Sequence, residues 1–471
     1  MASSEDTLHK PGQLFAARQN VYTKDVKGPF RTLKWSMLVF VLAVYYLTPW
    51  IRWDRGEGAP DQAVLIDMAG RKAYFFFIEI WPQDIYILTG LLVVAALTLF
   101  FVTSIAGRIW CAYACPQTVW TDLYMWIERK IEGDGPKRRK RDAGPFTLHR
   151  AALKTVKHAI WLLIAIATGG AWIFYFQDAP GVFPVLFTGE AGSTTYFFIG
   201  LFTCTTYLLG GWAREQVCTY MCPWPRFQAA MFDEDTLIVG YHEYRGEPRS
   251  RHAKRQAVSS APAGDCIDCG LCVEVCPTGI DIRDGNQLEC IGCGLCVDAC
   301  NNVMAKLARP ANLISHETDR NLRRLRQGQP RRYKLWRPRT IFYATLLAGL
   351  SVLMVFALIA RAPIALDVIA DRAPLYVTLS DGSVRNGYTL KLINKSHNTH
   401  MLDVKTLGLE GARVKTYNTI ATRPDAVTTV HVFVMAPSSG PASQTYTLQV
   451  HDAATGLSVE EPAIFRRPGN L

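Results

Sequence analysis

The sequence predicts a multi-domain membrane protein: an α-helical transmembrane domain of about five spans, a cysteine-rich cytoplasmic domain and a C-terminal immunoglobulin-like β-sandwich. Hydrophobic residues make up 49% of the 471 residues, and they gather in long blocks with Lys and Arg at their edges. Most of the 13 cysteines fall into short, regularly spaced motifs. The C-terminal region alternates polar and apolar residues in short runs that turn residues separate, which is typical of β-strands.

Five apolar stretches approach the roughly 20 residues that a helix needs to cross a bilayer. They lie at 33–51, 84–105, 156–177, 193–212 and 340–360. Lys and Arg concentrate before the first stretch, between the second and the third, and before the fifth. Because basic loops stay on the cytoplasmic side, this pattern predicts five spans with the N-terminus in the cytoplasm and the C-terminus outside it. No recognition motif for nucleic acid accompanies the basic run at 137–141, so we expect that run to face lipid headgroups and no nucleic acid.

The spans divide the chain into five parts. These are a cytoplasmic segment 1–32, the first four helices within 33–212, a second cytoplasmic segment 213–338, the fifth helix 340–360 and the β-sandwich 364–471. No signal peptide precedes the first apolar stretch, so we expect the N-terminus to be retained. The sandwich is predicted to have about six or seven strands and no disulfide, and by the topology it lies outside the cytoplasm, in the periplasm.

The strongest signal lies in the second cytoplasmic segment, where one cysteine spacing occurs twice. Cys266, Cys269, Cys272 and Cys276, followed by Pro277, spell C-x2-C-x2-C-x3-C-P. Cys290, Cys293, Cys296 and Cys300 repeat the spacing, with Asn301 in place of the proline. Bacterial two-cluster ferredoxins have this pattern, and the fourth cysteine of each run binds the other cluster. Two structural zinc sites would match the number of cysteines but not their spacing.

We therefore predict two 4Fe–4S clusters in a cytoplasmic ferredoxin domain at about 257–310. The ligands of cluster 1 are Cys266, Cys269, Cys272 and Cys300, and those of cluster 2 are Cys290, Cys293, Cys296 and Cys276. Gly270, Gly292 and Gly294 are expected to bring the loop backbone close to the clusters, because glycine adopts backbone conformations that other residues avoid. Such a domain passes single electrons between a donor and an acceptor.

A second pair of motifs marks a candidate acceptor end. Cys111, Tyr113, Cys115 and Pro116 follow the second span, and Cys218, Tyr220, Cys222 and Pro223 follow the fourth. Both motifs spell C-x-Y-x-C-P at the cytoplasmic end of a hydrophobic helix, which indicates an internal repeat. If the helix continues through the motif, both sulfurs lie on one face. If it ends there, the proline suits the first turn of a new helix, whose dipole would lower the pKa of the second cysteine.

Four thiolates from two such hairpins could converge at the membrane surface. Soft thiolate sites select Cu(I), and they could also hold zinc or a further iron–sulfur cluster. Cys111, Cys115, Cys218 and Cys222 are therefore the candidate catalytic and copper-binding residues. The alternative, that they are buried small side chains without a ligand, is weakened because the motif recurs at matched positions.

Three further features are less informative. We interpret Cys204, in the fourth span, as a helix-packing residue and not as a ligand. His158 could ligate a haem, but no histidine stands at a suitable position in the other spans. His397, His400 and Met401 form a small group in the predicted sandwich that could bind copper, although a chance grouping explains it as well.

Together these features resemble the FixG/RdxA/CcoG family of bacterial inner-membrane iron–sulfur proteins. The resemblance covers nearly the whole chain, and WCAYACPQTVW and CTYMCPWPRFQ carry it most specifically. It implies a cupric reductase that uses two 4Fe–4S clusters to reduce Cu(II), its substrate, to Cu(I) for the assembly of cbb3-type cytochrome oxidase. The implied partners are copper transporters or chaperones and oxidase assembly factors, besides the lipid bilayer. The cytoplasmic electron donor stays open, and an oligomer is compatible with the sequence.

Two other functions stay open on the residues alone. The chain could be an electron-transfer subunit that docks on a larger respiratory membrane complex and has no copper chemistry. It could also be a redox or oxygen sensor whose clusters decompose, but no output domain is visible in the sequence.

Overall fold

The computed structural model describes residues 20–56, 59–250, 264–415 and 419–468. The chain divides into two compact units, one made of residues 1–51 and 63–354 and the other of residues 52–62 and 355–471. Five helices among the described residues are long and apolar enough to cross a membrane. They are Pro29–Trp50, Pro82–Ala106, Leu148–Ile173, Ser193–Ala213 and Pro338–Ile359. Each coincides with a predicted span, so the prediction of a five-span membrane protein is confirmed.

The third span departs most from its predicted bounds. Helix α6 (Leu148–Ile173) begins inside the basic segment and not at residue 156, because Thr147 caps its N-terminus. The Thr147 hydroxyl accepts a hydrogen bond from the backbone N–H of Arg150 at 3.2 Å. Lys and Arg are good helix formers, so the basic residues that follow continue the helix instead of delaying it.

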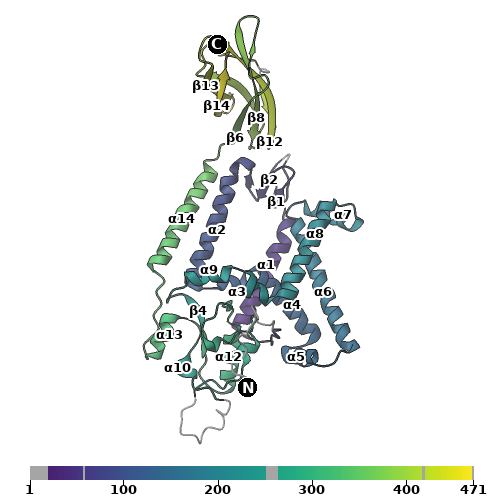
Figure 1. Cartoon of the computed structure of the whole chain (residues 1–471), viewed down its shortest axis with the longest axis vertical. Helices are drawn as coiled ribbons and strands as arrows, with labels where there is room; N and C mark the ends of the chain where they lie inside the picture. The colour runs from purple at the N-terminus through teal and green to yellow at the C-terminus, as the bar shows by residue number, and fades with distance from the viewer. Residues whose placement is uncertain (1–19, 57–58, 251–263, 416–418, 469–471) are drawn as a thin grey trace, which may run out of the picture. The chain divides into compact units, whose positions relative to one another are not determined.

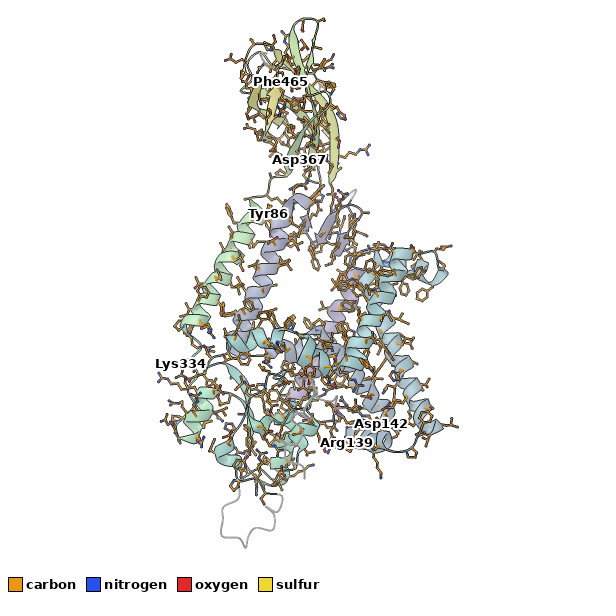
Figure 2. The ribbon with its side chains drawn as sticks, in the orientation of Figure 1. Tyr86, Arg139, Asp142, Lys334, Asp367 and Phe465 are labelled. Carbon is orange, nitrogen blue, oxygen red and sulfur yellow. The ribbon has the colours of Figure 1, made fainter. Side chains whose placement is uncertain are left out.

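The other spans belong to α1 (Pro29–Leu47), α2 (Ile85–Ala106), α8 (Ser193–Thr206) and α14 (Pro338–Ile359). Helix α8 continues as a π-helical segment, Tyr207–Ala213, and packs along α6 (Figure 1). The run at 137–141 lies within a short helix, α5 (Gly135–Ala143). Figure 2 shows Arg139 of α5 and Lys334 at the end of the membrane helices opposite Tyr86 of α2. Basic segments that are far apart in the sequence therefore share one end of the first unit.

A small antiparallel sheet connects α1 to α2. Its strands are β1 (Val64–Asp67), β2 (Lys72–Phe75) and β3 (Ile78–Ile80), in the order β1-β2-β3. Helix α7 (Ala179–Thr188) lies in the connection between α6 and α8. Both elements occur at the end of the helices that carries Tyr86 (Figures 1 and 2).

The cysteine-rich domain is larger than the predicted 257–310. Strand β4 (Leu237–Tyr241) precedes the cysteines and pairs antiparallel with β5 (Ile314–Thr318), which follows them. Between them lie α10 (Glu243–Gly246), α11 (Leu271–Glu274) and α12 (Leu295–Lys306), and α13 (Asp319–Arg326) follows β5. One apolar core joins Val239 of β4, Ile314 of β5 and several of the cysteines, so the strands belong to the same domain.

The second unit contains a β-sandwich of two antiparallel sheets. One sheet has the order β10-β12-β8-β6 with β7 beside β8, and the other has the order β11-β9-β13-β14. The strands are β6 (Ile364–Ala370), β7 (Val377–Thr378), β8 (Ser383–Asn394), β9 (His400–Leu407), β10 (Arg413–Lys415), β11 (Ile420–Thr422), β12 (Ala426–Pro437), β13 (Ser443–Asp452) and β14 (Ser458–Arg466). Alternate residues of β8, such as Val384, Tyr388 and Leu390, are buried between the sheets, as the period of a strand requires.

Candidate metal centre

The eight cysteines of the ferredoxin domain gather in two groups, and each group takes one cysteine from the other run. Cys266, Cys269, Cys272 and Cys300 line one small cavity. Burial, and then the adjacent Cys272, Cys266 and Cys269, raises the pKa of Cys300 to about 12. Burial likewise raises the pKa of Cys296, and the adjacent Cys293, Cys290 and Cys276 raise it further. These are the two groupings that the crossed ligand pattern requires.

The surroundings of these thiols fit a 4Fe–4S cluster. Gly270, Gly292 and Gly294 have φ values of 68°, 71° and 73°, the left-handed region that glycine adopts without strain. Burial raises the pKa of Cys290 to about 12, but the backbone N–H of Gly292 lowers it by donating to the sulfur. Buried thiolates that repel one another need a cationic ligand, and backbone donors to sulfur are characteristic of iron–sulfur sites. The donor set therefore matches the group.

The replacement of proline by Asn301 has a local consequence. Helix α11 ends at Glu274, before Pro277, whereas α12 runs through Asn301 to Lys306. Asparagine retains the backbone N–H that proline lacks, so the second helix can continue. The Asn301 side-chain oxygen also accepts a hydrogen bond from the Asn312 backbone N–H at 2.7 Å. The turn after the second run therefore differs from the first, while Cys300 still lines the cavity of the first group.

In the first C-x-Y-x-C-P motif the helix ends between the two cysteines. Helix α3 (Ile109–Tyr113) carries Cys111, and Cys115 is the N-cap of α4 (Pro116–Glu132) with proline in the first turn. The Thr118 hydroxyl donates to the carbonyl oxygens of Cys111 and Cys115 at 2.7 and 3.0 Å. This residue therefore fixes the break between α3 and α4.

The second motif has the same sequence pattern and a different backbone. Cys218 lies in a π-helical turn, Val217–Met221, which Cys222 closes by donating its backbone N–H to the Val217 carbonyl at 2.8 Å. Helix α9 (Trp224–Met231) follows. A π-turn inserts an extra residue per turn and is frequent at functional sites.

The structure brings the four cysteines of the two motifs together. Burial, and then the neighbouring Cys115, raises the pKa of Cys111 to about 12, and Cys222 adds to it. Burial, and then Cys115 and Cys111, raises the pKa of Cys218 to about 12. All four side chains are partly buried. Among the described residues, no three His, Cys, Asp or Glu side chains lie close enough to hold a single metal ion as they stand.

The predicted effect of the helix dipole on Cys115 is outweighed. Burial raises the pKa of Cys115, although the backbone N–H groups of Thr118 and Gln117 at the start of α4 lower it. The helix N-terminus acts in the predicted direction. The prediction of a lowered pKa for Cys115 is nevertheless wrong, because desolvation is the larger effect.

The first motif lies directly against the second cysteine group of the ferredoxin domain. The Tyr113 hydroxyl donates to the Cys293 carbonyl at 3.1 Å, and Tyr113 packs in one apolar core with Ile291 and Cys293. Arg108, which precedes α3, donates to the Cys290 carbonyl at 2.8 Å. One hydrogen bond therefore separates the backbone of a predicted cluster ligand from the tyrosine between Cys111 and Cys115.

A buried cation from the first span, Lys34, lies close to Cys218 of the second motif and to Cys293 of the ferredoxin domain. The Lys34 ammonium lies 4.0 Å from the Asp122 carboxylate, and its side chain is 4% exposed. Lys34 and Cys218 line one small cavity together with Ile291, the neighbour of Cys290. The positive charge lowers the pKa of Cys218 and of Cys293, although burial raises both overall. Lys34 therefore favours the negatively charged thiolate at Cys218 and at Cys293.

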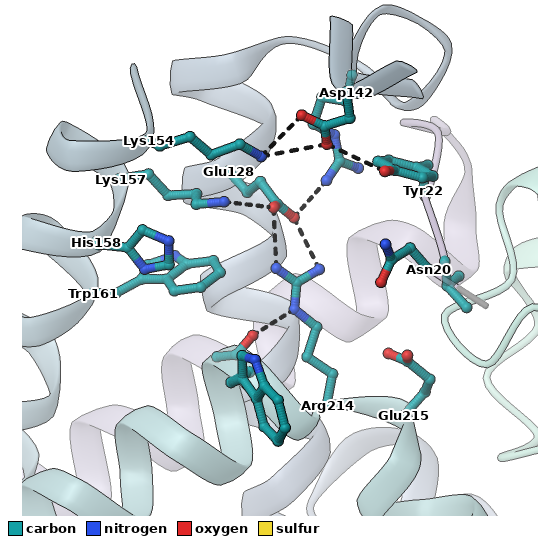
Figure 3. Close-up of a pocket in the computed structure, with 14 residues that line it drawn as sticks. Asn20, Tyr22, Glu128, Asp142, Lys154, Lys157, His158, Trp161, Arg214 and Glu215 are labelled. Atoms are coloured by element: carbon teal, nitrogen blue, oxygen red, sulfur yellow. Dashed lines mark hydrogen bonds and ion pairs between the residues drawn. The ribbon is translucent and has the colours of Figure 1, made fainter. Parts of the chain in front are cut away.

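A cluster of ion pairs around Glu128 joins α4 to the second motif (Figure 3). The buried Glu128 carboxylate binds Arg138, Lys157 at 3.1 Å and Arg214 at 3.0 Å. Burial would raise the pKa of Glu128, but Arg214 and Arg138 lower it to about 2. Arg214 precedes the π-turn that carries Cys218, so this carboxylate ties the two repeats together.

Glu128 and its partners line a pocket of about 240 Å³ that contains no cysteine. Because each cation in Figure 3 already faces a carboxylate, we interpret this pocket as part of the scaffold and not as the metal site. Lys34, Arg108 and Glu128 were not among the site residues predicted from the sequence. Only Lys34 gave a signal, as an ionisable residue near the start of an apolar span.

The three less informative features do not join the site. Cys204 is exposed on α8, so its interpretation as a packing residue is wrong within this chain. His158 pairs with the Tyr207 hydroxyl at 2.9 Å. His400 is buried, with Nδ1 2.6 Å from Asp452 and Nε2 2.8 Å from the Ser396 hydroxyl. Both nitrogens of His400 are thus engaged, which speaks against copper binding by His397, His400 and Met401.

Three family models match the chain. A 4Fe–4S dicluster domain matches residues 213–319, which include the eight ferredoxin cysteines. A 4Fe–4S binding domain matches residues 88–133, which include Cys111 and Cys115. An immunoglobulin-like fold at the C-terminus of FixG matches residues 354–468. The predicted iron–sulfur membrane protein with an immunoglobulin-like sandwich is therefore confirmed.

Curated relatives resemble the chain over nearly its whole length. The nitrogen fixation protein FixG of Rhizobium meliloti is 47% identical over 97% of this chain and 94% of its own. Protein RdxB of Cereibacter sphaeroides is 45% identical over 99% and 100%, and protein RdxA of the same organism is 44% identical over 92% and 93%. With these identities and matches, the chain belongs to the FixG/RdxA family of membrane-bound iron–sulfur electron-transfer proteins.

Proposed function

We propose that the protein is a cupric reductase that reduces Cu(II) to Cu(I) at the four C-x-Y-x-C-P cysteines, in the inner membrane, for the assembly of cbb3-type cytochrome oxidase. One observation carries the proposal. The four thiols lie near enough to one another to raise one another's pKa, and Tyr113, between Cys111 and Cys115, is hydrogen-bonded to the Cys293 carbonyl. An electron that reaches the second cysteine group therefore has a short path to a thiol site that suits copper.

In this proposal Cys266, Cys269, Cys272 and Cys300 hold one 4Fe–4S cluster, and Cys276, Cys290, Cys293 and Cys296 hold the other. When bound, the two clusters supply one-electron storage and transfer. The chain's own residues do the rest. The four motif thiols lose their protons as they bind copper, because the thiolate is the metal ligand. Each Cu(II) takes up one electron, and the resulting Cu(I) is held because soft sulfur prefers it.

The basic end of the first unit faces the cytoplasm in this proposal, because Lys and Arg favour that side. The ferredoxin domain lies at that end, as α12 and α5 show in Figure 1. A cytoplasmic one-electron reductant is then the donor, and copper transporters or chaperones and oxidase assembly factors are the partners. The FixG and RdxA relatives support the placement in this family.

The test compares reduction of Cu(II) with the state of the clusters. Cys111, Cys115, Cys218 and Cys222 are changed together to Ser, and Cys204→Ser serves as the matched control because Cys204 lies outside both motifs. Anaerobic protein is reduced, freed of excess reductant and mixed with Cu(II). Cluster oxidation is followed by EPR, and Cu(I) by a chelator that absorbs on binding it. We expect the quadruple variant to lose Cu(I) formation and the control to retain it; a wild-type rate in the quadruple variant would refute the proposal.

A second candidate function has an observation of its own. The 4Fe–4S binding domain model covers Cys111 and Cys115, which favours iron at these cysteines and an electron-transfer subunit without copper chemistry. Iron and copper analysis of the quadruple variant separates the two candidates. Loss of about four iron atoms per chain, the content of one cubane, with no copper bound to the wild type would favour the second candidate.

A further inference from the structure

A basic groove lies at the N-terminal end of the first membrane-spanning helix, away from the cysteines. Its volume is about 590 Å³, and side chains of α1 and α4 line it. The lining that matters here comprises Lys27, Arg31, Trp35, Trp126, Arg129 and Lys130. Two carboxylates, those of Asp25 and Asp134, also line it, so four cations face two acids. The groove therefore has a surplus of positive charge.

Two arginines of the groove retain unused hydrogen-bond donors. Arg31 binds both oxygens of Asp122 through Nη1, at 2.9 and 3.0 Å. Its Nε and Nη2 groups are buried and have no hydrogen-bond partner among the described residues, and the same is true of Nη2 of Arg129. The Arg31 side chain is 7% exposed and lies over the Trp35 ring at 4.7 Å. Buried donors of this kind are costly unless a ligand or water satisfies them.

The two arginines also repel each other. Burial lowers the pKa of Arg129, and the adjacent Arg31 lowers it further, while Asp122 and Asp25 act in the opposite direction. The Asp25 carboxylate is 3.9 Å from Nε of Arg129. An anion in the groove would relieve this repulsion and would accept from the unused donors, and arginine forks match phosphate geometry.

The position of the groove indicates where such an anion comes from. Trp35 and Trp126 contact each other edge to face, 5.6 Å apart, and tryptophan is enriched at the membrane–water interface. Farther along α1, Val39, Phe40 and Val44 are exposed on the surface of a helix that spans the membrane. Hydrocarbon chains can cover these residues while a headgroup stays among the cations. Basic pockets at the cytoplasmic ends of membrane helices bind anionic lipids in this way.

We propose that the groove between α1 and α4 binds the phosphate of an anionic phospholipid such as phosphatidylglycerol, with the acyl chains along the exposed face of α1. Arg31 and Arg129 contact the phosphate, Lys27 and Lys130 add long-range attraction, and the two tryptophans hold the glycerol region. The same lipid contacts both α1 and α4 and stabilises their packing. Asp298 of the ferredoxin domain caps that end of α1, accepting from the Arg31 backbone N–H at 2.8 Å.

The experiment measures lipid binding to the full chain after delipidation in a neutral detergent. Dioleoyl phosphatidylglycerol and dioleoyl phosphatidylcholine are titrated separately, and native mass spectrometry counts the bound lipids. Lys130→Gln and Arg129→Gln remove groove cations. Arg139→Gln removes an exposed cation of α5 that does not line the groove, so it is the matched control. Lys130 is exposed, so its replacement leaves folding intact, which the melting temperature checks.

We expect one site that prefers phosphatidylglycerol, with about five-fold weaker binding after loss of one groove cation and unchanged binding in Arg139→Gln. Equal binding of the two lipids, or equal losses in the groove variants and the control, would overturn the proposal. A third arm uses glycerol 1-phosphate, which has the headgroup phosphate without acyl chains. If it displaces phosphatidylglycerol at equal concentration, the ligand is a free phosphate ester and the assignment to a lipid is wrong.

Discussion

The two C-x-Y-x-C-P motifs share a sequence pattern but meet different surroundings. In the first copy Tyr113 is 7% exposed and bonded to the Cys293 carbonyl, whereas in the second copy Tyr220 is 63% exposed. The first copy has a helix break with Cys115 as an N-cap, and the second has a π-turn. Both copies nevertheless contribute thiols to the same place. The two copies therefore contribute equally to the set of metal ligands. Only the first copy has a direct contact with the ferredoxin domain through which electrons can pass.

The largest expected effect comes from replacing Glu128, whose carboxylate links the two copies. Glu128→Gln removes the carboxylate that faces the buried Arg138, the buried Lys157 and the half-buried Arg214, and Lys157 keeps its second partner, Glu132. Breaking a buried ion pair from one side costs about 3–5 kcal/mol. We expect a clear fall in the thermal midpoint of the detergent-solubilised protein. Loss of copper reduction is expected as well, because Arg214 positions the second copy.

Asp142→Asn is the matched control, since Asp142 lines the same pocket but pairs with the more exposed Arg150 and Lys154. Its effect should stay below about 1 kcal/mol. Because the pKa of Glu128 is lowered to about 2 in the folded state, its stabilisation is complete above the usual value of 4.5 and is lost as the pH falls from there toward 2. The stability difference between wild type and Glu128→Gln should thus be constant from pH 8 to 5. A difference that shrinks within this range would contradict the ion-pair account.

The asymmetry of the two tyrosines predicts a smaller, kinetic effect. Tyr113→Phe removes the hydroxyl that donates to Cys293, and Tyr220→Phe is the same change in the second copy. We expect oxidation of the reduced clusters by Cu(II) to slow about five-fold in the first variant, the equivalent of one hydrogen bond of about 1 kcal/mol, and to stay unchanged in the second. Stopped-flow absorbance measures both rates. Equal effects in the two variants would mean that the copies are equivalent routes.

The features that the sequence predicts best are those in which spacing alone determines geometry. The cysteine runs fix the ferredoxin loops, and apolar length fixes the spans to within a few residues, apart from the start of α6. The convergence of Cys111 and Cys218 follows from the repeat, because equal hairpins end at equal depths.

The sequence does not reveal which side chains join the domains. Tyr113 occupies the same motif position as Tyr220, and only the fold decides that the first packs on Ile291 and the second is exposed. Glu128 and Arg214 are far apart in the chain, and neither belongs to a motif. The π-turn at Val217–Met221 was also unpredictable, since its sequence matches a motif that is helical in the other copy.

The smallest expected effect concerns the positive charge of Lys34, which acts on the motif cysteine Cys218 and on the ferredoxin cysteine Cys293. Lys34 lies in the cavity between Cys218 and Ile291, and its charge favours the more negative, reduced state of a cluster held near Cys293. Lys34→Met should therefore lower the reduction potential of that cluster by roughly 50 mV, about 1 kcal/mol for one electron, as expected for one charge removed at an effective dielectric of about 20. EPR-monitored redox titration measures the shift.

Lys34→Arg retains the positive charge, so its cluster should keep the wild-type reduction potential. If Lys34 had only a structural role, Lys34→Met and Lys34→Arg would have the same reduction potential. Lys137→Met, at an exposed position on α5, controls for a general change in net charge. If only the cluster near Cys293 responds, the charge acts at the interface between the ferredoxin domain and the motif cysteines. That outcome would mean that the two copies differ in their electrostatic surroundings as well as in their hydrogen bonds. Unchanged potentials in Lys34→Met would restrict the asymmetry to the Tyr113 contact.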